Sequence, residues 1–211
     1  MEKAAWYERF KVDVPEGESG RVRVERFVVE DERNLTNMRY AMAGMRTVPE
    51  GTWTRITEGG TLWMSDTPSE IIDHIHAIRE MEKRGGRVAI NGLGVGVVTQ
   101  AALRAPTVER VDVVELSEAV ISLVGPHYTA LAEAEGKELV IHHADALTMR
   151  WPVGTRFDVA WHDIWPDITT DNLETMGTLH RKYGRISAWQ GSWRREYLQS
   201  ERRRYAASGW Y

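Results

Sequence analysis

The chain has 211 residues, 42% of them hydrophobic, and a formal net charge of −4. This length can bury one substantial core and indicates one domain with a small additional unit. The absence of cysteine excludes disulfides, thiolate metal sites and cysteine nucleophiles. No apolar run reaches the roughly 18 residues that a membrane helix needs, and residues 1–10 lack the apolar core of a signal peptide. We therefore expect a cytoplasmic protein with no membrane partner.

The net negative charge also argues against a nucleic-acid partner. The arginines between residues 194 and 204 form a local basic run. We interpret this run as the solvated face of a terminal helix, where positive charge complements the helix dipole.

The first 66 residues are predicted to form a small β-rich extension. Residues 20–30 alternate between polar and apolar side chains, as a strand does, and residues 48–64 add turns and further short strands. Between them, residues 34–45 are compatible with a short helix that Gly44 ends.

A clear helix signal opens the second region, residues 67–211. Thr67 is at the N-cap, Pro68 at the first helical position and Glu70 three residues after the cap, which predicts a capping box. The helix is expected to end near residues 85–86. Its apolar stripe is predicted to contain Ile71, Ile72, Ile75 and Ile78.

From residue 87 onward, strand and helix patterns alternate, which predicts a Rossmann-like, doubly wound and mostly parallel sheet covered on both faces. The chain ends soon after the fifth strand, so the sheet is expected to be truncated. An open sheet edge is a liability. We therefore expect the terminal segment or a second copy in a homodimer to cover it. The predicted elements are strands 87–91, 111–115, 138–142, 157–163 and 184–190, with helices 96–104, 117–132, 169–183 and 192–206.

The most informative motif is a short apolar strand, residues 87–91, that runs into Gly92, Gly94 and Gly96. Glycine lets the backbone turn sharply and approach a ligand without interference from a Cβ atom. The apolar helix that follows points its N-terminus at such a ligand. The pattern predicts a loop that binds a nucleotide cofactor.

A second strand, residues 111–115, ends in Glu115 about 20 residues past the glycines. A βαβ unit presents an acidic residue at this position to the hydroxyl groups of a ribose. Glu115 is therefore the first candidate for a cofactor contact. The alternative is a solvated glutamate at the end of a strand.

The spacing of the third glycine distinguishes between cofactors. A dinucleotide-binding loop needs a small residue three positions after the second glycine, and here Val97 occupies that position. The branched side chain suits a ligand that has no pyrophosphate. The G-x-G-x-G form, followed by an acid at the end of the second strand, resembles the class I S-adenosylmethionine-dependent methyltransferase family, from residue 87 to about residue 191. The resemblance implies that S-adenosylmethionine is the cofactor, with residues 91–96 (Asn91, Gly92, Gly94 and Gly96 among them) beside its methionine part and Glu115 on its ribose.

Further positions match that family in order. Asp145 and Ala146 follow the third strand and resemble the family's contacts with the adenine. Asp163 ends the fourth strand, where the resemblance places residues that face the reactive carbon of the cofactor. There a carboxylate can accept a proton from an attacking amine or hydroxyl, which makes Asp163 the candidate catalytic base. The alternative is an ordinary turn aspartate.

Several tryptophans lie near the predicted strand ends. Trp165 and Trp193 occur in loop-like contexts and are candidates for the substrate pocket, where an aromatic ring can stack on a flat substrate or shield a sulfonium. Asp167 is a further candidate for substrate binding, although Pro166-Asp167 is also good turn chemistry.

The order of motifs is also similar to that of spermidine synthases. On the helix that begins at residue 67, Glu70 and His74 match that family's acid-rich motif, which makes His74 a candidate substrate contact, whereas two acids and a tyrosine of the motif are missing. A polyamine pocket must neutralise two or more ammonium groups, so the losses argue against aminopropyl transfer.

The remaining histidines do not suggest a metal site. His142 and His143 are neighbours on a strand and face opposite ways, so we expect no metal. His162 alternates with Asp163 and is equally well explained as a core histidine. We therefore predict an S-adenosylmethionine-dependent methyltransferase for a small-molecule acceptor. The alternatives are a spermidine-synthase-like aminopropyltransferase and a non-catalytic S-adenosylmethionine-binding subunit.

Overall fold

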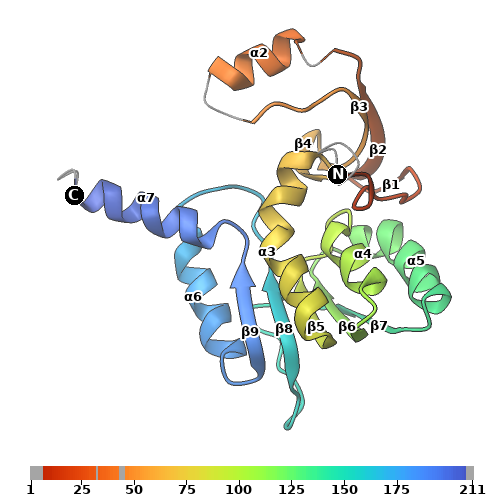
Figure 1. Cartoon of the computed structure of the whole chain (residues 1–211), viewed down its shortest axis with the longest axis vertical. Helices are drawn as coiled ribbons and strands as arrows, with labels where there is room; N and C mark the ends of the chain where they lie inside the picture. Colours follow the sequence, from red (N-terminus) through yellow and green to blue (C-terminus); the bar gives the residue numbers. More distant parts are fainter. Residues whose placement is uncertain (1–6, 32, 43–45, 208–211) are drawn as a thin grey trace.

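The computed structural model describes residues 7–31, 33–42 and 46–207 and contains two sheets (Figure 1). The larger sheet has five strands in the order β7-β6-β5-β8-β9, and every neighbouring pair in it is parallel. The expected parallel, doubly wound sheet is confirmed. Its strands are Gly86–Asn91 (β5), Val108–Glu115 (β6), Glu138–His143 (β7), Phe157–His162 (β8) and Ser187–Ser192 (β9).

Helices cover both faces of this sheet. Two consecutive residues of β8 show that both faces are covered, because neighbouring residues of a strand point to opposite faces of the sheet. The Trp161 ring contacts His74 of α3, whereas the His162 ring contacts Tyr183 of α6. Helices α4 and α5 pack beside α3 on its face of the sheet. The helices are Pro68–Arg84 (α3), Val97–Arg104 (α4), Glu118–Ala134 (α5) and Asn172–Tyr183 (α6).

The strand order creates a switch point between β5 and β8. From β5 the chain winds outward to β6 and β7, and it then returns to form β8 on the other side of β5. The connections leaving β5 and β8 therefore diverge at the carboxyl end of the sheet. Open parallel sheets bind their ligands in the crevice that this divergence leaves.

The N-terminal extension forms a second, antiparallel sheet of four strands in sequence order. The strands expected within residues 20–30 and 48–64 are confirmed. The predicted helix appears as α2, and Gly44, its expected end, lies outside the described residues. The elements are Gly17–Ser19 (β1), Val22–Val29 (β2), Leu35–Met42 (α2), Gly51–Glu58 (β3) and Thr61–Ser65 (β4).

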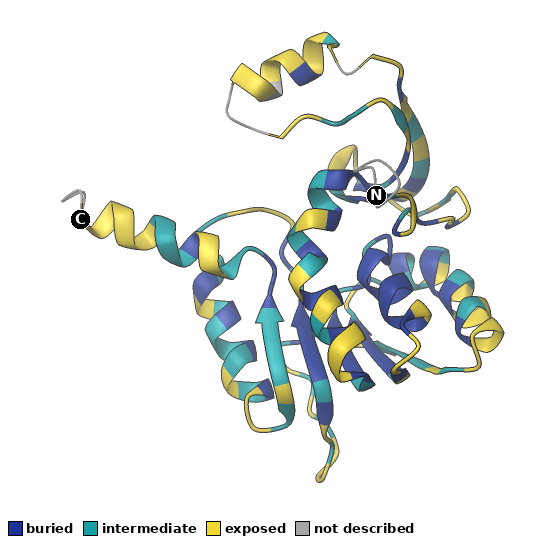
Figure 2. Cartoon of the chain, in the orientation of Figure 1, coloured by how far each residue is buried: buried dark blue, intermediate teal, exposed yellow. Residues whose placement is uncertain are grey.

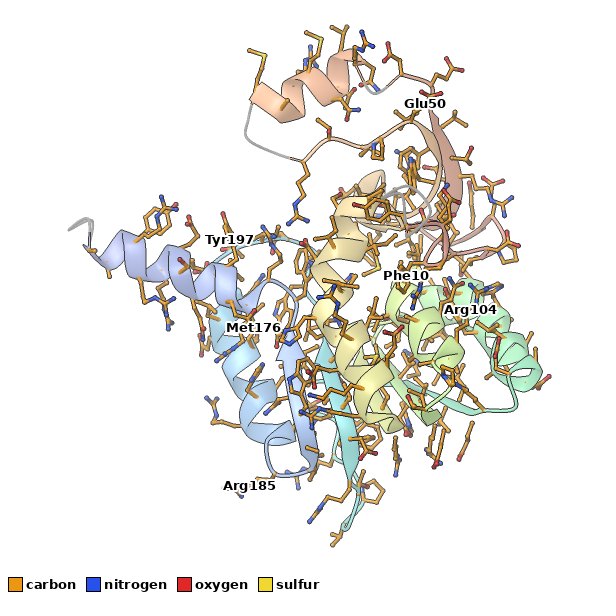
Figure 3. The ribbon with its side chains drawn as sticks, in the orientation of Figure 1. Phe10, Glu50, Arg104, Met176, Arg185 and Tyr197 are labelled. Carbon is orange, nitrogen blue, oxygen red and sulfur yellow. The ribbon has the colours of Figure 1, made fainter. Side chains whose placement is uncertain are left out.

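The extension shares its core with the larger sheet. Phe10 is buried where the N-terminal segment meets α4 (Figure 3). Gln100 of α4 donates a hydrogen bond of 2.7 Å to the carbonyl of Lys11. The buried Asp66 carboxylate accepts hydrogen bonds from the amides of Val12 and Thr54. These contacts fix β4 and the start of α3 relative to the carboxyl end of the larger sheet.

Two details of α3 differ from the sequence prediction. Thr67 is the N-cap residue, but its hydroxyl bonds to the hydroxyls of Ser65 and Ser69 instead of a helix amide, so the predicted capping box is wrong. The buried face is also rotated: Ile72 is exposed, and His74 lies in the stripe instead. The buried residues of α3 are Pro68, Ile71, His74, Ala77, Ile78 and Met81.

The last strand and helix begin three residues later than predicted, at Ser187 for β9 and at Arg195 for α7 (Arg195–Ala207). Helix α7 runs away from the sheet and is largely exposed, as is α2 (Figure 2). Within the described part of the chain, α7 therefore does not cover the β9 edge, and a second copy at that edge remains a prediction. None of the described helices is both long and apolar enough to cross a membrane.

Candidate functional site

A cavity of about 710 Å³ opens at the carboxyl end of the parallel sheet. This volume lies within the roughly 300–1,000 Å³ of small-molecule sites. Its wall includes residues that follow β5, β6, β7 and β8, and the N-terminal sheet closes it from the other side. The predicted site residues in the wall are Gly92, Gly94, Glu115, Asp145, Ala146, Asp163, Trp165 and Trp193.

The glycines of the loop after β5 permit close backbone contacts. Gly92 has φ of +96°, and a Cβ atom there would lie 1.9 Å from the carbonyl oxygen of Asp163. The amide of Asp163 donates to the carbonyl of Asn91 at 2.8 Å. Glycine at position 92 therefore allows the ends of β5 and β8 to meet. Gly94 leaves room in the same way for the Met64 side chain of β4.

Gly96 has a structural role and does not line the cavity. A Cβ atom at Gly96 would lie 2.0 Å from the Tyr128 ring of α5. The Tyr128 hydroxyl donates to the carbonyl of Val95 at 2.8 Å. The third glycine thus lets a buried tyrosine support the loop from below. No local sequence signal connects position 128 with the loop.

Several amides of the loop that the resemblance places beside the methionine part of the cofactor are already bonded within the chain. The amide of Gly92 donates to the carbonyl of Val114, and the amide of Gly96 donates to the carbonyl of Leu93. The amide of Leu93 donates to the Glu115 carboxylate. Among the described residues, the amides of Gly94 and Val95 are the ones in this loop that remain for a ligand.

The Glu115 carboxylate is held in place by the backbone. One oxygen accepts from the amide of Leu93 and the other from the amide of Ser117, both at 2.8 Å. Each carboxylate oxygen keeps a further lone pair for a second donor. The side chain is therefore oriented before any ligand arrives, which suits a contact with a ribose diol.

Asp145 is fixed in a similar manner. Its side chain accepts from the amide of Leu147 at 2.8 Å and from the Thr148 hydroxyl at 3.3 Å. Ala146 is buried beside it, and the Lys182 ammonium donates to the carbonyl of Ala146. The turn after β7 thus presents a carboxylate and a small apolar side chain to the cavity wall.

Asp163 stands next to His74 at the centre of the site. Its Oδ2 atom lies 3.6 Å from His74 Nε2, and the two side chains are 8% and 0% exposed. Burial raises the pKa of the Asp163 carboxyl well above its usual range, and Glu70, Asp73 and Glu115 add to this. Burial lowers the pKa of His74 to about 4, against an opposing effect of Asp73. Burial thus disfavours the charged form of both side chains, so the free pair is not held together as an ion pair.

His74 does not reach the cavity wall, and neither of its ring nitrogens has a hydrogen-bond partner among the described residues. It lies behind Asp163, seen from the cavity. Asp167 also lies away from the wall: it is exposed, and its carbonyl and carboxylate accept hydrogen bonds from the Asn172 side chain. His74 and Asp167 are thus two candidate substrate contacts that do not line the cavity. Among the described residues, its wall contains six acidic side chains and three tryptophans.

Asn91 and His162 form a buried pair under the site. The Asn91 amide group lies 2.7 Å from His162 Nδ1, and its oxygen accepts from the Tyr183 hydroxyl at 2.8 Å. Burial lowers the pKa of His162 to about 3, against the hydrogen bond with Gln190. Both side chains are fully buried and neither lines the cavity, so His162 is a core histidine bonded to side chains.

Aromatic side chains form much of the remaining wall. The Trp165 indole donates to the Thr175 hydroxyl at 2.8 Å, which fixes the ring against α6. Trp193 follows β9, and its backbone amide donates to the carbonyl of His162 at 2.9 Å. Trp63 of β4 joins them from the N-terminal sheet. Each of the three rings thus reaches the cavity from a different element.

Sequence reasoning missed the contributions of the extension and of two acids. Glu58, Trp63 and Met64 line the cavity from β3 and β4, and no motif in residues 1–66 indicates this. Asp171 joins them at the start of α6. Glu70 was recognised only as a matching position in the spermidine-synthase motif, yet it lies in the wall. Burial, followed by the charge of Asp73, raises its pKa to about 7.

No family model matches the sequence, and no curated relative matches it. Many solved structures resemble parts of it, and three examples each cover 57% of this chain. They are the Pyrococcus horikoshii protein PH1948, a candidate RNA methyltransferase (21% identity, TM-score 0.42), the N-terminal domain of EvdMO1 with S-adenosylhomocysteine bound (19%, 0.42), and the N-methyltransferase NodS from Bradyrhizobium japonicum (15%, 0.44). The matches cover 54%, 47% and 64% of those chains, so this chain spans about half the length of the first two.

Proposed function

We propose that the protein is an S-adenosylmethionine-dependent methyltransferase that acts on a small-molecule acceptor. One observation carries the proposal: Gly94, Glu115, Asp145 and Asp163, which follow four different strands, line a single cavity. These are the residues that the sequence motifs assign to the methionine part, the ribose, the adenine and the chemistry. The carboxyl ends of parallel strands meet at one edge of a sheet, and here a cavity of ligand size opens between these side chains.

The chemistry of the wall fits this cofactor. The fixed carboxylate of Glu115 can accept hydrogen bonds from the ribose hydroxyls, and that of Asp145 can accept one from an adenine amino group. Leu116, Val120 and Leu147 supply apolar surface on the same side of the cavity. The cofactor, when bound, supplies a methyl group on a sulfonium. Asp163 is the group in the wall that can take a proton from the acceptor.

The acid-rich wall is the one observation that favours a second candidate, aminopropyl transfer. The carboxylate of S-adenosylmethionine would lie among acidic side chains, with the amides of Gly94 and Val95 as its donors. The decarboxylated form of the cofactor lacks this group. The relative affinity of the two forms therefore discriminates between the two reactions.

The test compares ligands by thermal unfolding and calorimetry. S-adenosylmethionine and S-adenosylhomocysteine should raise the melting temperature, because a ligand at 100 times its Kd adds about 2.7 kcal/mol of stability, whereas NAD should not. S-adenosylmethionine should also bind more tightly than its decarboxylated form by about 1–3 kcal/mol, the scale of a charge-assisted contact. A shift with NAD alone would overturn the cofactor, and a preference for the decarboxylated form would support aminopropyl transfer.

A further inference from the structure

The cavity wall has acidic side chains and lacks basic ones among its described residues. Among the described residues that line the cavity, six carry a carboxyl group and none is a lysine, an arginine or a histidine. A site for a phosphorylated or carboxylated acceptor would instead present cationic donors. The six acids are Glu58, Glu70, Glu115, Asp145, Asp163 and Asp171.

The acids differ in whether the protein already uses them. Glu115 and Asp145 accept hydrogen bonds from backbone amides next to them. Within the described part of the chain, no donor forms a hydrogen bond with the side chains of Glu70 or Asp163, and His74 Nε2 is 3.6 Å from the Asp163 carboxyl group. A half-buried carboxyl without a donor is unfavourable in its charged form, and a bound cation removes that penalty.

The neighbouring arginines lower the pKa of Glu70 through their charge, but they form their ion pairs with Asp73 and not with Glu70. Arg46 and Arg194 both bond to Asp73, at 2.7 and 3.2 Å from its Oδ1 atom. Asp73 lies about one turn further along α3. The charges that face Glu70 are therefore those of Asp73, the two arginines and Asp163.

A second, independent observation concerns His74. Its side chain is fully buried, both ring nitrogens lack a partner, and Nε2 points at Asp163 from 3.6 Å. The Trp161 ring packs edge-on against the imidazole, with centroids 5.9 Å apart. Because His74 Nε2 has no other partner and faces the carboxyl group, a proton on Asp163 can be shared with this imidazole nitrogen. The groups that face Asp163 are His74, Glu70, Asp73 and Glu115.

We propose that the acceptor is an amine that binds as a cation between Glu70 and Asp163, with a flat or apolar body against Trp165 and Trp193. This inference rests on the proposed function and specifies its substrate class. The two tryptophans and Trp63 offer the aromatic surface that stabilises a cation or stacks on a ring.

The reaction balances with the groups present. A bound ammonium next to Asp163 favours the charged form of its carboxyl group, whose own proton leaves to solvent as the cation binds. The ammonium then passes one proton to this carboxylate, which leaves a neutral amine with a free electron pair. That nitrogen attacks the methyl carbon of the cofactor; the new N–C bond forms as the C–S bond breaks, and the sulfur keeps the bonding pair. The products are the methylated ammonium and S-adenosylhomocysteine.

The experiment measures binding of three matched probes by calorimetry at pH 8, with S-adenosylhomocysteine present in excess. The probes are 2-phenylethylamine, its neutral analogue 2-phenylethanol and the anion 3-phenylpropionate. The amine should bind at least about tenfold more tightly than the alcohol, the scale of one charge-assisted hydrogen bond, and the anion should bind most weakly. Glu70→Gln should remove the preference for the amine, whereas the matched control Glu30→Gln, at an exposed position of the extension, should keep it.

The outcomes separate this inference from the proposed function. Binding of S-adenosylhomocysteine is measured first. If it binds but the alcohol or the anion equals the amine, or none of the probes binds, the cationic acceptor is overturned and the methyltransferase stands. If S-adenosylhomocysteine does not bind, the proposed function fails, and the same three probes without it still test the cation preference. Tighter binding of 1,4-diaminobutane than of 2-phenylethylamine would overturn the aromatic body and indicate a polyamine.

Discussion

The two ends of the cavity use carboxyl groups in different ways. At one end, Glu115 and Asp145 are tied to backbone amides in their own turns. At the other end, Glu70 and Asp163 are largely buried without a donor, and the pKa of each is raised. The first arrangement gives acceptors of fixed orientation. The second gives groups that can exchange a proton or take up a cation. A rigid binding end and a titratable end therefore coexist within one wall.

The largest expected effect is at the rigid end. Glu115→Ala should weaken the binding of S-adenosylhomocysteine by about 2–4 kcal/mol, because it removes charge-assisted hydrogen bonds and releases the amide of Leu93 in the glycine loop. Calorimetry measures the affinity, and a thermal melt checks the fold. Glu109→Ala, an exposed glutamate on the same strand, is the matched control and should bind as the native protein does. Unchanged affinity in Glu115→Ala would show that Glu115 does not bind the cofactor. It would then be a solvated glutamate at the end of a strand, as in the alternative interpretation.

A smaller effect is expected at the titratable end, and its sign follows from linkage. Burial and Asp73 raise the pKa of Glu70 from 4.5 to about 7, so the folded state holds a proton that the unfolded state releases. The contribution of Glu70 to the stability of the native protein should therefore fall as the pH rises from about 4.5 to about 7, and Asp163 contributes with the same sign. The lowered pKa values of the buried His74 and His162 contribute with the opposite sign, so the contribution of Glu70 is measured as a difference between a variant and the native protein.

Glu70→Gln removes the part of the pH dependence of stability that Glu70 causes. At pH 8 the variant should be more stable than the native protein by about 2 kcal/mol, and near pH 4.5 the difference should vanish. Urea unfolding at both pH values measures it, with Glu30→Gln as the control that should follow the native curve. A difference between the variant and the native protein that does not grow from pH 5 to pH 8 would contradict the raised pKa of Glu70 and, with it, the contrast between the two ends.

The smallest effect is expected outside both ends. Asp167 is exposed and bonded to Asn172, so Asp167→Ala should change the affinity for S-adenosylhomocysteine and for 2-phenylethylamine by less than about 0.5 kcal/mol. Calorimetry with the two ligands checks this. A loss of more than about 1 kcal/mol for the amine would show that residue 167 approaches the acceptor when ligands bind, as the sequence motif suggested.

The sequence alone predicted the parallel sheet and the order of its elements. Alternating apolar strands and amphipathic helices are local patterns, and their period follows from backbone geometry. The same local logic located Gly92, Gly94, Glu115, Asp145 and Asp163, because each ends a strand of a parallel sheet and such ends meet at one edge.

Only the tertiary structure decided what stands around these residues. Trp63 and Met64 reach the cavity because residues 10–14 and Asp66 hold the extension against the sheet, through contacts between positions far apart in the sequence. His74 lies behind Asp163 and not in the wall as predicted, because the buried face of α3 is rotated from the isoleucine stripe that the periodicity indicated. Whether a carboxyl group is tied to an amide or left without a donor depends on burial and on neighbours from other elements. Local sequence does not contain that information, and here it separates the rigid end of the cavity from the titratable one.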